Sequence, residues 1–220
     1  VAAVVTVPDR PAGRGRKITF SPVKDYALEN GLMLLQPEKL REPEFISILK
    51  GLNADLFVVV AFRMLPEAVW SIPALGTVNL HASLLPQYRG AAPINHAIIN
   101  GETRSGVTTF LIDKEIDTGM ILLSRETAIS PDETAGSLHD HLMVIGAALT
   151  VETAEGLFSH SLKPVPQSSI REEQLKTAPK IFTADTVIDW NKPAEQVHNL
   201  IRGLSPYPGA ITIMHRGSRD

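Results

Sequence analysis

The chain has 220 residues, of which 44% are hydrophobic and 5% aromatic, and its formal net charge is −3 at pH 7. This composition is ordinary for a soluble α/β protein of one domain or slightly more, and the small charge excludes a global field that attracts nucleic acid or membranes. The sequence contains no cysteine, which excludes disulfide scaffolds, thiolate zinc sites and cysteine nucleophiles, and its longest apolar runs are far shorter than a membrane span.

Segments typical of strands and of helices alternate along the chain. The runs that predict strands are residues 1–7, 32–35, 56–61, 76–81, 106–112, 120–129 and 210–214. Helical spacing or helix-start signals predict helices at 22–30, 43–52, after Pro66, from Pro93, from Ser130 to about 158, and at 193–203. The alternation predicts an α/β, Rossmann-like fold with a mostly parallel sheet and helices on both faces. Residues 161–190 lack periodicity and are predicted to form a connector.

Residues 1–7 and 56–61 lack polar alternation, so we expect them to be strands buried on both faces. The first of these runs starts at the first residue, without an initiator methionine or a signal-peptide pattern. The sequence also stops at Asp220, soon after a new strand-like run. We therefore expect the chain to be a fragment of a longer protein.

Residues 8–17 combine prolines and glycines with four basic side chains. These are Arg10, Arg14, Arg16 and Lys17. Such a segment is expected to form neither a helix nor a strand ladder, so it is predicted to be a mobile basic loop. It could be an ordinary solvated loop, or it could contact a phosphate backbone, since polyanions require clustered Arg and Lys.

The stretch 77–94 is the one around which the chain is organised, because it begins as a strand and ends as a helix start. Asn79 and His81 are two residues apart and share one face of this strand. A loop, 83–86, follows, and open α/β sheets usually bind ligands at this place, beyond the carboxyl end of a strand.

Asp117 lies in a polar turn after another strand and could reach the same edge of the sheet. A carboxylate beside an imidazole fixes its tautomer, and a nearby amide can donate to a developing oxyanion, so Asn79, His81 and Asp117 suit attack on a carbonyl. They could equally be a strand-edge amide, a half-buried histidine and a turn former. A nucleophile elbow, a phosphate loop and metal-ligand spacing are absent from the sequence.

The motifs resemble those of the folate-dependent formyltransferases. The resemblance rests on residues 79–86, 88–93 and 117–119, and it extends over essentially the whole chain, including 58–62, 65–66 and 188–190. Residues 8–17 resemble the basic loop of those members that act on methionyl-tRNA.

This resemblance implies transfer of formyl from 10-formyltetrahydrofolate to the α-amino group of methionine on initiator methionyl-tRNA, without a metal. His81 would move the amine proton, Asn79 would stabilise the oxyanion, and Asp117 would orient His81. The residues that would line the folate site are Ser83, Leu84, Leu85 and Pro86. Those that would contact tRNA are Arg14, which would insert against the acceptor stem, Arg16 and Lys17. A monomeric protein without membrane contact is implied, cytoplasmic in bacteria and organellar in a eukaryote.

The resemblance also implies a domain division, with the catalytic domain and connector at 1–190 and the start of a C-terminal OB-like β-barrel domain that binds tRNA at 191–220. The family's first strand and its small-residue turn are missing, so activity of residues 1–220 alone is an open question. Three alternatives remain: a formyltransferase acting on a small amine (an amino sugar nucleotide or glycinamide ribonucleotide), a 10-formyltetrahydrofolate hydrolase, and a non-catalytic RNA-binding protein. The basic loop favours tRNA over the small amines, and the Asn79, His81 and Asp117 set argues against a pure binder.

Overall fold

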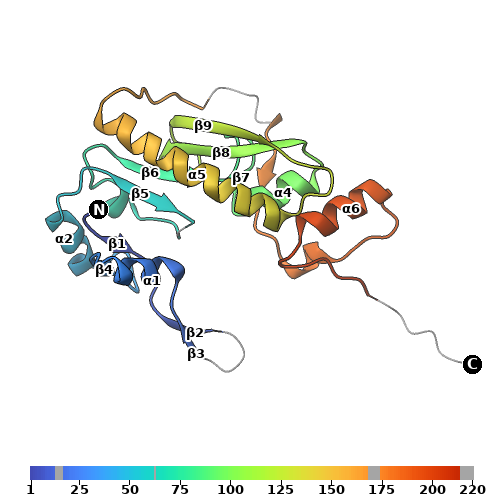
Figure 1. The fold of residues 1–220 in the computed structure, drawn as a ribbon, viewed down its shortest axis with the longest axis horizontal. Coiled ribbons are helices and arrows are strands. Elements are labelled where there is room, and N and C mark those ends of the chain that lie inside the picture. Colours follow the sequence, from blue (N-terminus) through green and yellow to red (C-terminus); the bar gives the residue numbers. More distant parts are fainter. Residues whose placement is uncertain (13–16, 62, 168–173, 214–220) are drawn as a thin grey trace, which may run out of the picture. The chain divides into compact units, whose positions relative to one another are not determined.

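The structure is a computed structural model that describes residues 1–12, 17–61, 63–167 and 174–213. These residues divide into two compact units (Figure 1). Unit 1 comprises 1–57 and 62–77, and unit 2 comprises 58–61 and 78–220. The Asn79, His81 and Asp117 set lies wholly in unit 2, and the basic segment lies in unit 1.

Unit 1 is built on two short parallel strands, β1 (Val4–Val5) and β4 (Leu34–Leu35). Three helices accompany them: α1 (Pro22–Glu29), α2 (Pro43–Gly51) and α3 (Glu67–Trp70). Each helix begins at or just after a proline, which suits the first turn of a helix. The apolar face of α2 carries Phe45 and Leu49 into a small core with Leu40 and Val69. The predicted strand 1–7 is confirmed only at Val4–Val5, and Val1 and Val7 are exposed.

The prediction that residues 8–17 cannot form a strand ladder is wrong. β2 (Arg10–Ala12) pairs with β3 (Lys17–Thr19) in an antiparallel hairpin, and Pro11 lies opposite Ile18. Proline cannot donate to a ladder, but an antiparallel pair contains positions that exchange no hydrogen bond, so one proline is tolerated there. Arg14 and Arg16 lie outside the described residues, and of Lys17 only the backbone is described.

The sheet of unit 2 has the strand order β5 (Phe57–Val60), β6 (Thr77–His81), β8 (Arg104–Leu111), β9 (Ile121–Ala128). β6 pairs antiparallel with β8, and β8 with β9, so the α/β class is confirmed but the sheet is mixed where we expected it to be mostly parallel. The connection between β8 and β9 is short, which permits a hairpin and excludes the long crossover that a parallel pair requires. Val58 and Val60 share one face of β5 and are exposed, so the prediction that this strand is buried on both faces is wrong.

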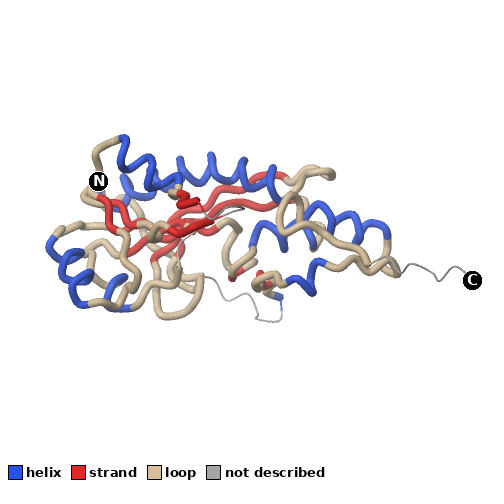
Figure 2. Tube along the Cα trace, turned by 90° about the horizontal axis from the view of Figure 1, so that it is seen from below, coloured by secondary structure: helices blue, strands red, loops and turns tan. Residues whose placement is uncertain are grey.

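Helix α5 (Ala135–Phe158) runs along β8 and β9 on one side of the sheet (Figures 1 and 2). Its residues Leu138, Leu142 and Leu149 are almost fully buried in the main core. Gly146 brings the helix close to β6, since a Cβ at this position would lie 2.7 Å from Leu80 Cδ2. By length and composition alone, α5 is the one described helix that could cross a membrane, and core helices meet the same test.

The helix α5 begins later than the Ser130 start that we predicted. Residues Ser130 and Glu133 form a turn instead, in which Glu133 N donates to the Ser130 carbonyl. Thr134 is the N-cap, and Thr134 and Ser137 exchange the two hydrogen bonds of a capping box. The predicted end of the helix at Phe158 is confirmed.

The remaining elements of unit 2 follow β6 in the chain. They are β7 (Arg89–Gly90), α4 (Pro93–Ile99), β10 (Thr177–Ala178), the 3₁₀ helix η2 (Thr183–Thr186) and α6 (Ala194–Gly203). β7 and β10 form a two-stranded parallel ladder, so part of the predicted connector returns to the loop after β6. Of the predicted strand 210–214, the described residues 210–213 contain only a bridge between Ile211 and Val187, and Met214 lies outside the described residues.

Candidate active site

His81 is the last residue of β6, and its side chain is buried with 6% exposure. Its Nε2 lies 2.9 Å from the carbonyl oxygen of Tyr88. A carbonyl oxygen can only accept a hydrogen bond, so Nε2 is the nitrogen that carries a proton. With Nε2 protonated in this way, Nδ1 is the nitrogen that faces a further partner. The backbone of the loop after β6 therefore fixes the orientation of the ring.

Asn79 precedes His81 by two residues on β6 and shares its face of the strand, opposite Phe110 of β8. The side chain of Asn79 is only partly buried. It makes no hydrogen bond to any other described residue, so its amide group remains available to a bound molecule. Leu80 points to the opposite face and packs against α5.

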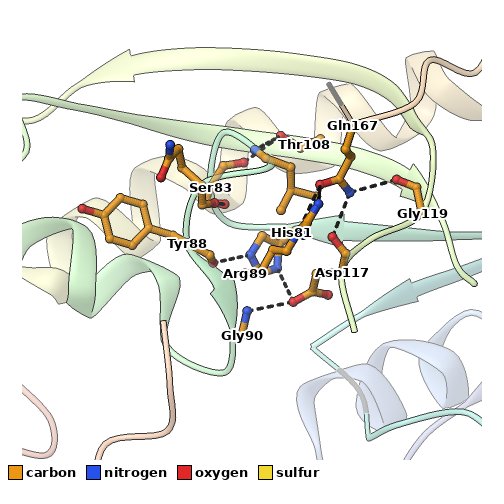
Figure 3. A network of polar contacts seen from close by, with 11 residues as sticks. His81, Ser83, Tyr88, Arg89, Gly90, Thr108, Asp117, Gly119 and Gln167 are labelled. Carbon is orange, nitrogen blue, oxygen red and sulfur yellow. Dashed lines mark hydrogen bonds and ion pairs between the residues drawn. The ribbon is translucent and has the colours of Figure 1, made fainter. Parts of the chain in front are cut away.

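Asp117 comes to His81 from the turn between β8 and β9 (Figure 3). Its Oδ2 lies 3.7 Å from His81 Nδ1 and accepts a hydrogen bond of 2.9 Å from Gly90 N. Its backbone has φ +57°, a left-handed conformation that Asp tolerates better than most residues. Both side chains are mostly buried, which strengthens the attraction between the carboxylate and a protonated ring.

A second set of hydrogen bonds holds the Asp117 turn from the other side. Gln167 Nε2 donates to the carbonyl oxygens of Asp117 and Gly119, at 2.8 Å each. Gln167 Oε1 in turn accepts from Arg89 Nε at 3.0 Å and from Arg89 Nη2 at 2.6 Å. Figure 3 shows the chain of contacts from Arg89 through Gln167 to the turn.

Hydrogen bonds to the protein interior fix the loop 83–86. Ser83 is 1% exposed, and its hydroxyl donates to the carbonyl oxygen of Gln87 at 2.7 Å. The Thr108 hydroxyl donates to the Ser83 carbonyl at 2.7 Å and accepts from Leu85 N at 3.2 Å. Leu85 and Pro86 are buried and Leu84 is half-buried, so these interactions fix the shape of the loop.

Tyr88, whose carbonyl holds His81, is itself fixed by a polar cluster. Its hydroxyl donates to Glu102 Oε1 at 2.5 Å, and Lys176 Nζ donates to the same oxygen at 2.5 Å. Burial first, and then the hydrogen bond to Glu102, raises the pKa of Tyr88 far above its usual value. For Glu102, burial raises the pKa, but the hydrogen bonds from Lys176 and Tyr88 outweigh this, and the net pKa is lowered.

The structure thus brings His81 and Asp117 together and places Asn79 on the same strand face as His81. The sequence interpretation gave no role to Gln167, Arg89 or Thr108. Among the described residues, no group of three or more His, Asp and Glu side chains is placed to hold a metal ion. A cavity of about 730 Å³ lies between the end of α4, η2 and α6, and Asn79, His81, Asp117 and Gln167 do not line it.

Comparisons with known proteins show the family to which the chain belongs. The sequence pattern of the formyl transferase family matches residues 1–153, and that of the formyl transferase C-terminal domain matches 180–219. The chain is 53% identical over 211 residues to the methionyl-tRNA formyltransferase of Bacteroides thetaiotaomicron. This match covers 96% of the chain but 66% of that relative, so the chain spans somewhat less than two thirds of its length.

Solved structures share the fold at low sequence identity. A 4-N formyltransferase from Francisella tularensis has a TM-score of 0.72 at 18% identity, over 88% of this chain and 78% of that one. An N-formyltransferase from Helicobacter canadensis, in complex with folinic acid and dTDP-3-aminofucose, has a TM-score of 0.65 at 22% identity, over 89% and 66%. From the family pattern and the match to the curated relative, the chain belongs to the formyl transferase family.

Proposed function

We propose that the protein transfers the formyl group of 10-formyltetrahydrofolate to the α-amino group of methionine on initiator methionyl-tRNA, and so supports the initiation of translation. The observation that carries this proposal is the 53% identity to a methionyl-tRNA formyltransferase over 96% of the chain. The paired His81 and Asp117, with Asn79 on the same face of β6, supply the groups that such a transfer requires.

In the proposed mechanism the amine attacks the formyl carbon while His81 Nδ1, the ring nitrogen that is not bonded to the Tyr88 carbonyl, accepts a proton from the amine nitrogen. Asp117 stabilises the imidazolium that forms, and the Asn79 amide donates to the oxygen that becomes negative. When the tetrahedral intermediate collapses, the bond between the formyl carbon and N10 of the folate breaks. The proton held by His81 passes to N10, so formyl and proton exchange places and no oxidant or metal is required.

The loop 83–86 is proposed to line the folate site. Since the Ser83 hydroxyl is occupied by the Gln87 carbonyl, the part of Ser83 in this role is to shape the loop, and half-buried Leu84 is the side chain better able to touch the folate. Leu85 and Pro86 are buried beneath it.

The basic hairpin is proposed to contact tRNA through Arg14, Arg16 and Lys17. Its base is well anchored: Asp9 forms an ion pair with Lys24 of α1 and accepts from Gln36 Nε2 at 2.9 Å. The hydrogen bonds from Lys24 and Gln36 lower the pKa of Asp9, so this anchor stays charged at neutral pH. An anchored base with basic residues beyond it suits a contact with phosphate groups.

We also propose that residues 1–190 belong to the catalytic domain with its connector, and that 191–220 begin an OB-like domain that binds tRNA. The bridge between Val187 and Ile211, and the hydrogen bond of 2.9 Å from Trp190 Nε1 to Thr212 Oγ1, support an ordered junction. A monomer in the cytoplasm suits an enzyme that meets charged tRNA before initiation.

The decisive experiment follows labelled formyl from 10-formyltetrahydrofolate into RNA, using the full-length protein and methionine-charged initiator tRNA. Transfer to charged but not to uncharged tRNA supports the proposal. Release of formate would favour a hydrolase, and formylation of an amino sugar nucleotide or glycinamide ribonucleotide would favour a small-amine enzyme. Binding of tRNA without transfer, in a protein that also fails to release formate, would favour an RNA-binding protein.

The part of the basic hairpin is tested by salt dependence. Arg14→Ala should weaken tRNA binding and reduce the slope of log affinity against log salt by about 1. Lys50→Ala, at the end of α2, removes an equal charge from an exposed position in the same unit and serves as the control. Equal slopes in the wild type and the Arg14 variant would remove Arg14 from the interface.

A further inference from the structure

Gln167 occupies an unusual place, since one carboxamide connects three segments of unit 2 that are distant in the sequence. Its nitrogen donates both hydrogens to the turn between β8 and β9, at the carbonyls of Asp117 and Gly119. Its oxygen accepts two N–H groups of one guanidinium, from Arg89 of β7. The four distances lie between 2.6 and 3.0 Å, so the carboxamide is fully used and its orientation is fixed (Figure 3).

Arg89, which holds the Gln167 oxygen, lies between the two residues whose backbone groups bond His81 and Asp117. Arg89 precedes Gly90, whose N–H holds Asp117 Oδ2. It follows Tyr88, whose carbonyl holds His81 Nε2. The position of Asp117 relative to His81 therefore depends on how the loop of residues 88–90 sits against the turn, and Gln167 is a direct tie between the two.

His81 Nδ1 and Asp117 Oδ2 are 3.7 Å apart, so the interaction between them is sensitive to where Gln167 holds the turn. This separation is longer than a direct hydrogen bond, and pairs of this kind shorten in the complex with substrate. The position of the turn therefore bears directly on whether the pair can close. Asp117 is the charged group that contacts the ring, whereas the Arg89 charge is directed at Gln167.

We propose that Gln167, oriented by Arg89, is a positioning residue that holds the Asp117 turn where its carboxylate can pair with His81. The hydrogen bonds of Gln167 go to the turn backbone and to Arg89, and not to His81 or the Asp117 carboxylate, so Gln167 acts through the backbone of the turn. The inference rests on the proposed function for its kinetic test, but the positioning itself can be measured without activity.

Two substitutions separate the parts of this bridge. Gln167→Met keeps the length and shape of the side chain and removes all four hydrogen bonds. Gln167→Glu keeps an acceptor for Arg89 but faces the two carbonyl oxygens with an acceptor instead of a donor, so it should release the turn as well. Either should lower kcat by about 10- to 100-fold with KM for the folate changed less than about 3-fold, as expected for misplacement of a catalytic group. Arg89→Lys, which keeps the charge but loses the fork, should have a smaller effect of the same kind.

Gln87→Met is the matched control. Gln87 also connects the loop after β6 to the connector: its Oε1 accepts from Lys176 N at 2.8 Å and its Nε2 donates to the Gln174 carbonyl at 3.3 Å. The control variant therefore loses a comparable tie that does not reach the Asp117 turn. A similar loss of kcat in this variant would show that general loosening of the loop is responsible, and would overturn the proposal.

A double-mutant cycle in the full-length protein makes the test specific. If Gln167 acts through Asp117, Gln167→Met should cost less than about 2-fold in the Asp117→Ala background, whereas additive losses would overturn the proposal. In parallel, NMR of ¹⁵N-histidine-labelled protein should show the His81 ring signals displaced in Gln167→Met and unchanged in Gln87→Met. Unchanged signals in both would overturn the positioning role, and displaced signals in a protein that transfers no formyl would uphold it while the proposed function failed.

Discussion

Asp117 Oδ2 lies 3.7 Å from His81 Nδ1 while it accepts a hydrogen bond of 2.9 Å from Gly90 N. The carboxylate beside the histidine is thus anchored to the loop that follows the histidine's own strand. The carbonyl oxygen of Tyr88, in the same loop, accepts a hydrogen bond from the other ring nitrogen, Nε2. The loop therefore fixes the positions of both His81 and Asp117. A carboxylate held in this way can stabilise an imidazolium without itself taking up the proton.

Asp117→Asn should separate the charge of the carboxylate from its shape. The amide oxygen can still accept from Gly90 N, but the stabilisation of a protonated His81 is lost. We expect turnover to fall by roughly 10²-fold or more with folate binding retained, as when acid–base catalysis is removed, and the same for His81→Ala and Asp117→Ala. Single-turnover formyl transfer and folate titration measure the two quantities. Turnover near that of the wild type in any of these variants would refute the mechanism.

Asn79→Ala should remove the proposed donor for the oxyanion and leave the histidine pair in place. Since the Asn79 amide bonds to no other described residue, its loss should leave stability within about 1 kcal/mol, a typical value for a partly exposed side chain without partners. Turnover should fall on the order of 10²-fold. Asn79→Asp, which retains an acceptor but offers no donor when ionised, should fall at least as far. If turnover is unchanged in Asn79→Ala, the amide has no part in catalysis.

The sequence was most informative where one short segment determines its own structure. β6, the start of α4 at Pro93 and the end of α5 at Phe158 follow from local spacing and proline placement, and they were predicted correctly. Asn79 and His81 share a strand face because of the period of the strand itself. The pairing of His81 with Asp117 was suggested from the turn after β8, on the expectation that parallel strands end at one edge of the sheet. Because β6 and β8 are antiparallel, β8 ends beside Val78, and the turn has to lead back toward His81 for Asp117 to reach it.

Other features depend on contacts that the local sequence does not encode. The pairing of β2 with β3 is one example, because it depends on how two segments on either side of the basic loop meet and not on the pattern within either segment. Gln167 lies in a segment without periodicity, and its partners Arg89 and Asp117 are 78 and 50 residues away in the chain. A single glutamine there carries no signal of its own, so only the tertiary structure reveals its contacts.

Gly90→Ala should disturb both stability and catalysis. Gly90 has φ +126°, and a Cβ there would collide with the Ala178 carbonyl oxygen and lie 2.9 Å from its carbon, so β7 and β10 would have to separate. The control is Gly31→Ala, because Gly31 also has a positive φ, +62°, but has no atom within 4 Å of the added Cβ. The control should lose roughly 1–2 kcal/mol and keep its turnover, whereas Gly90→Ala should lose more and also turn over more slowly. Urea unfolding and kcat measure both, and equal stability losses would contradict the steric argument.

The Tyr88 hydroxyl should make the free energy of unfolding fall at alkaline pH, and Tyr88→Phe should lack this contribution. Burial and the hydrogen bond to Glu102 raise the pKa of Tyr88 in the folded state above its ordinary value of 10.0. Above pH 10 the unfolded chain therefore loses the phenol proton while the folded protein keeps it. The folded state then binds more protons than the unfolded state, so the free energy of unfolding falls as pH rises, by up to about 1.4 kcal/mol per pH unit for one proton. Below pH 10 this contribution is fully present.

Other groups also titrate in this range, so the quantity to measure is the difference in unfolding free energy between wild type and Tyr88→Phe from pH 8 to 11. The advantage of the wild type should be constant up to about pH 10 and decline above it. A difference that stays constant to pH 11 would mean that the Tyr88 hydroxyl is not held as a buried, hydrogen-bonded donor.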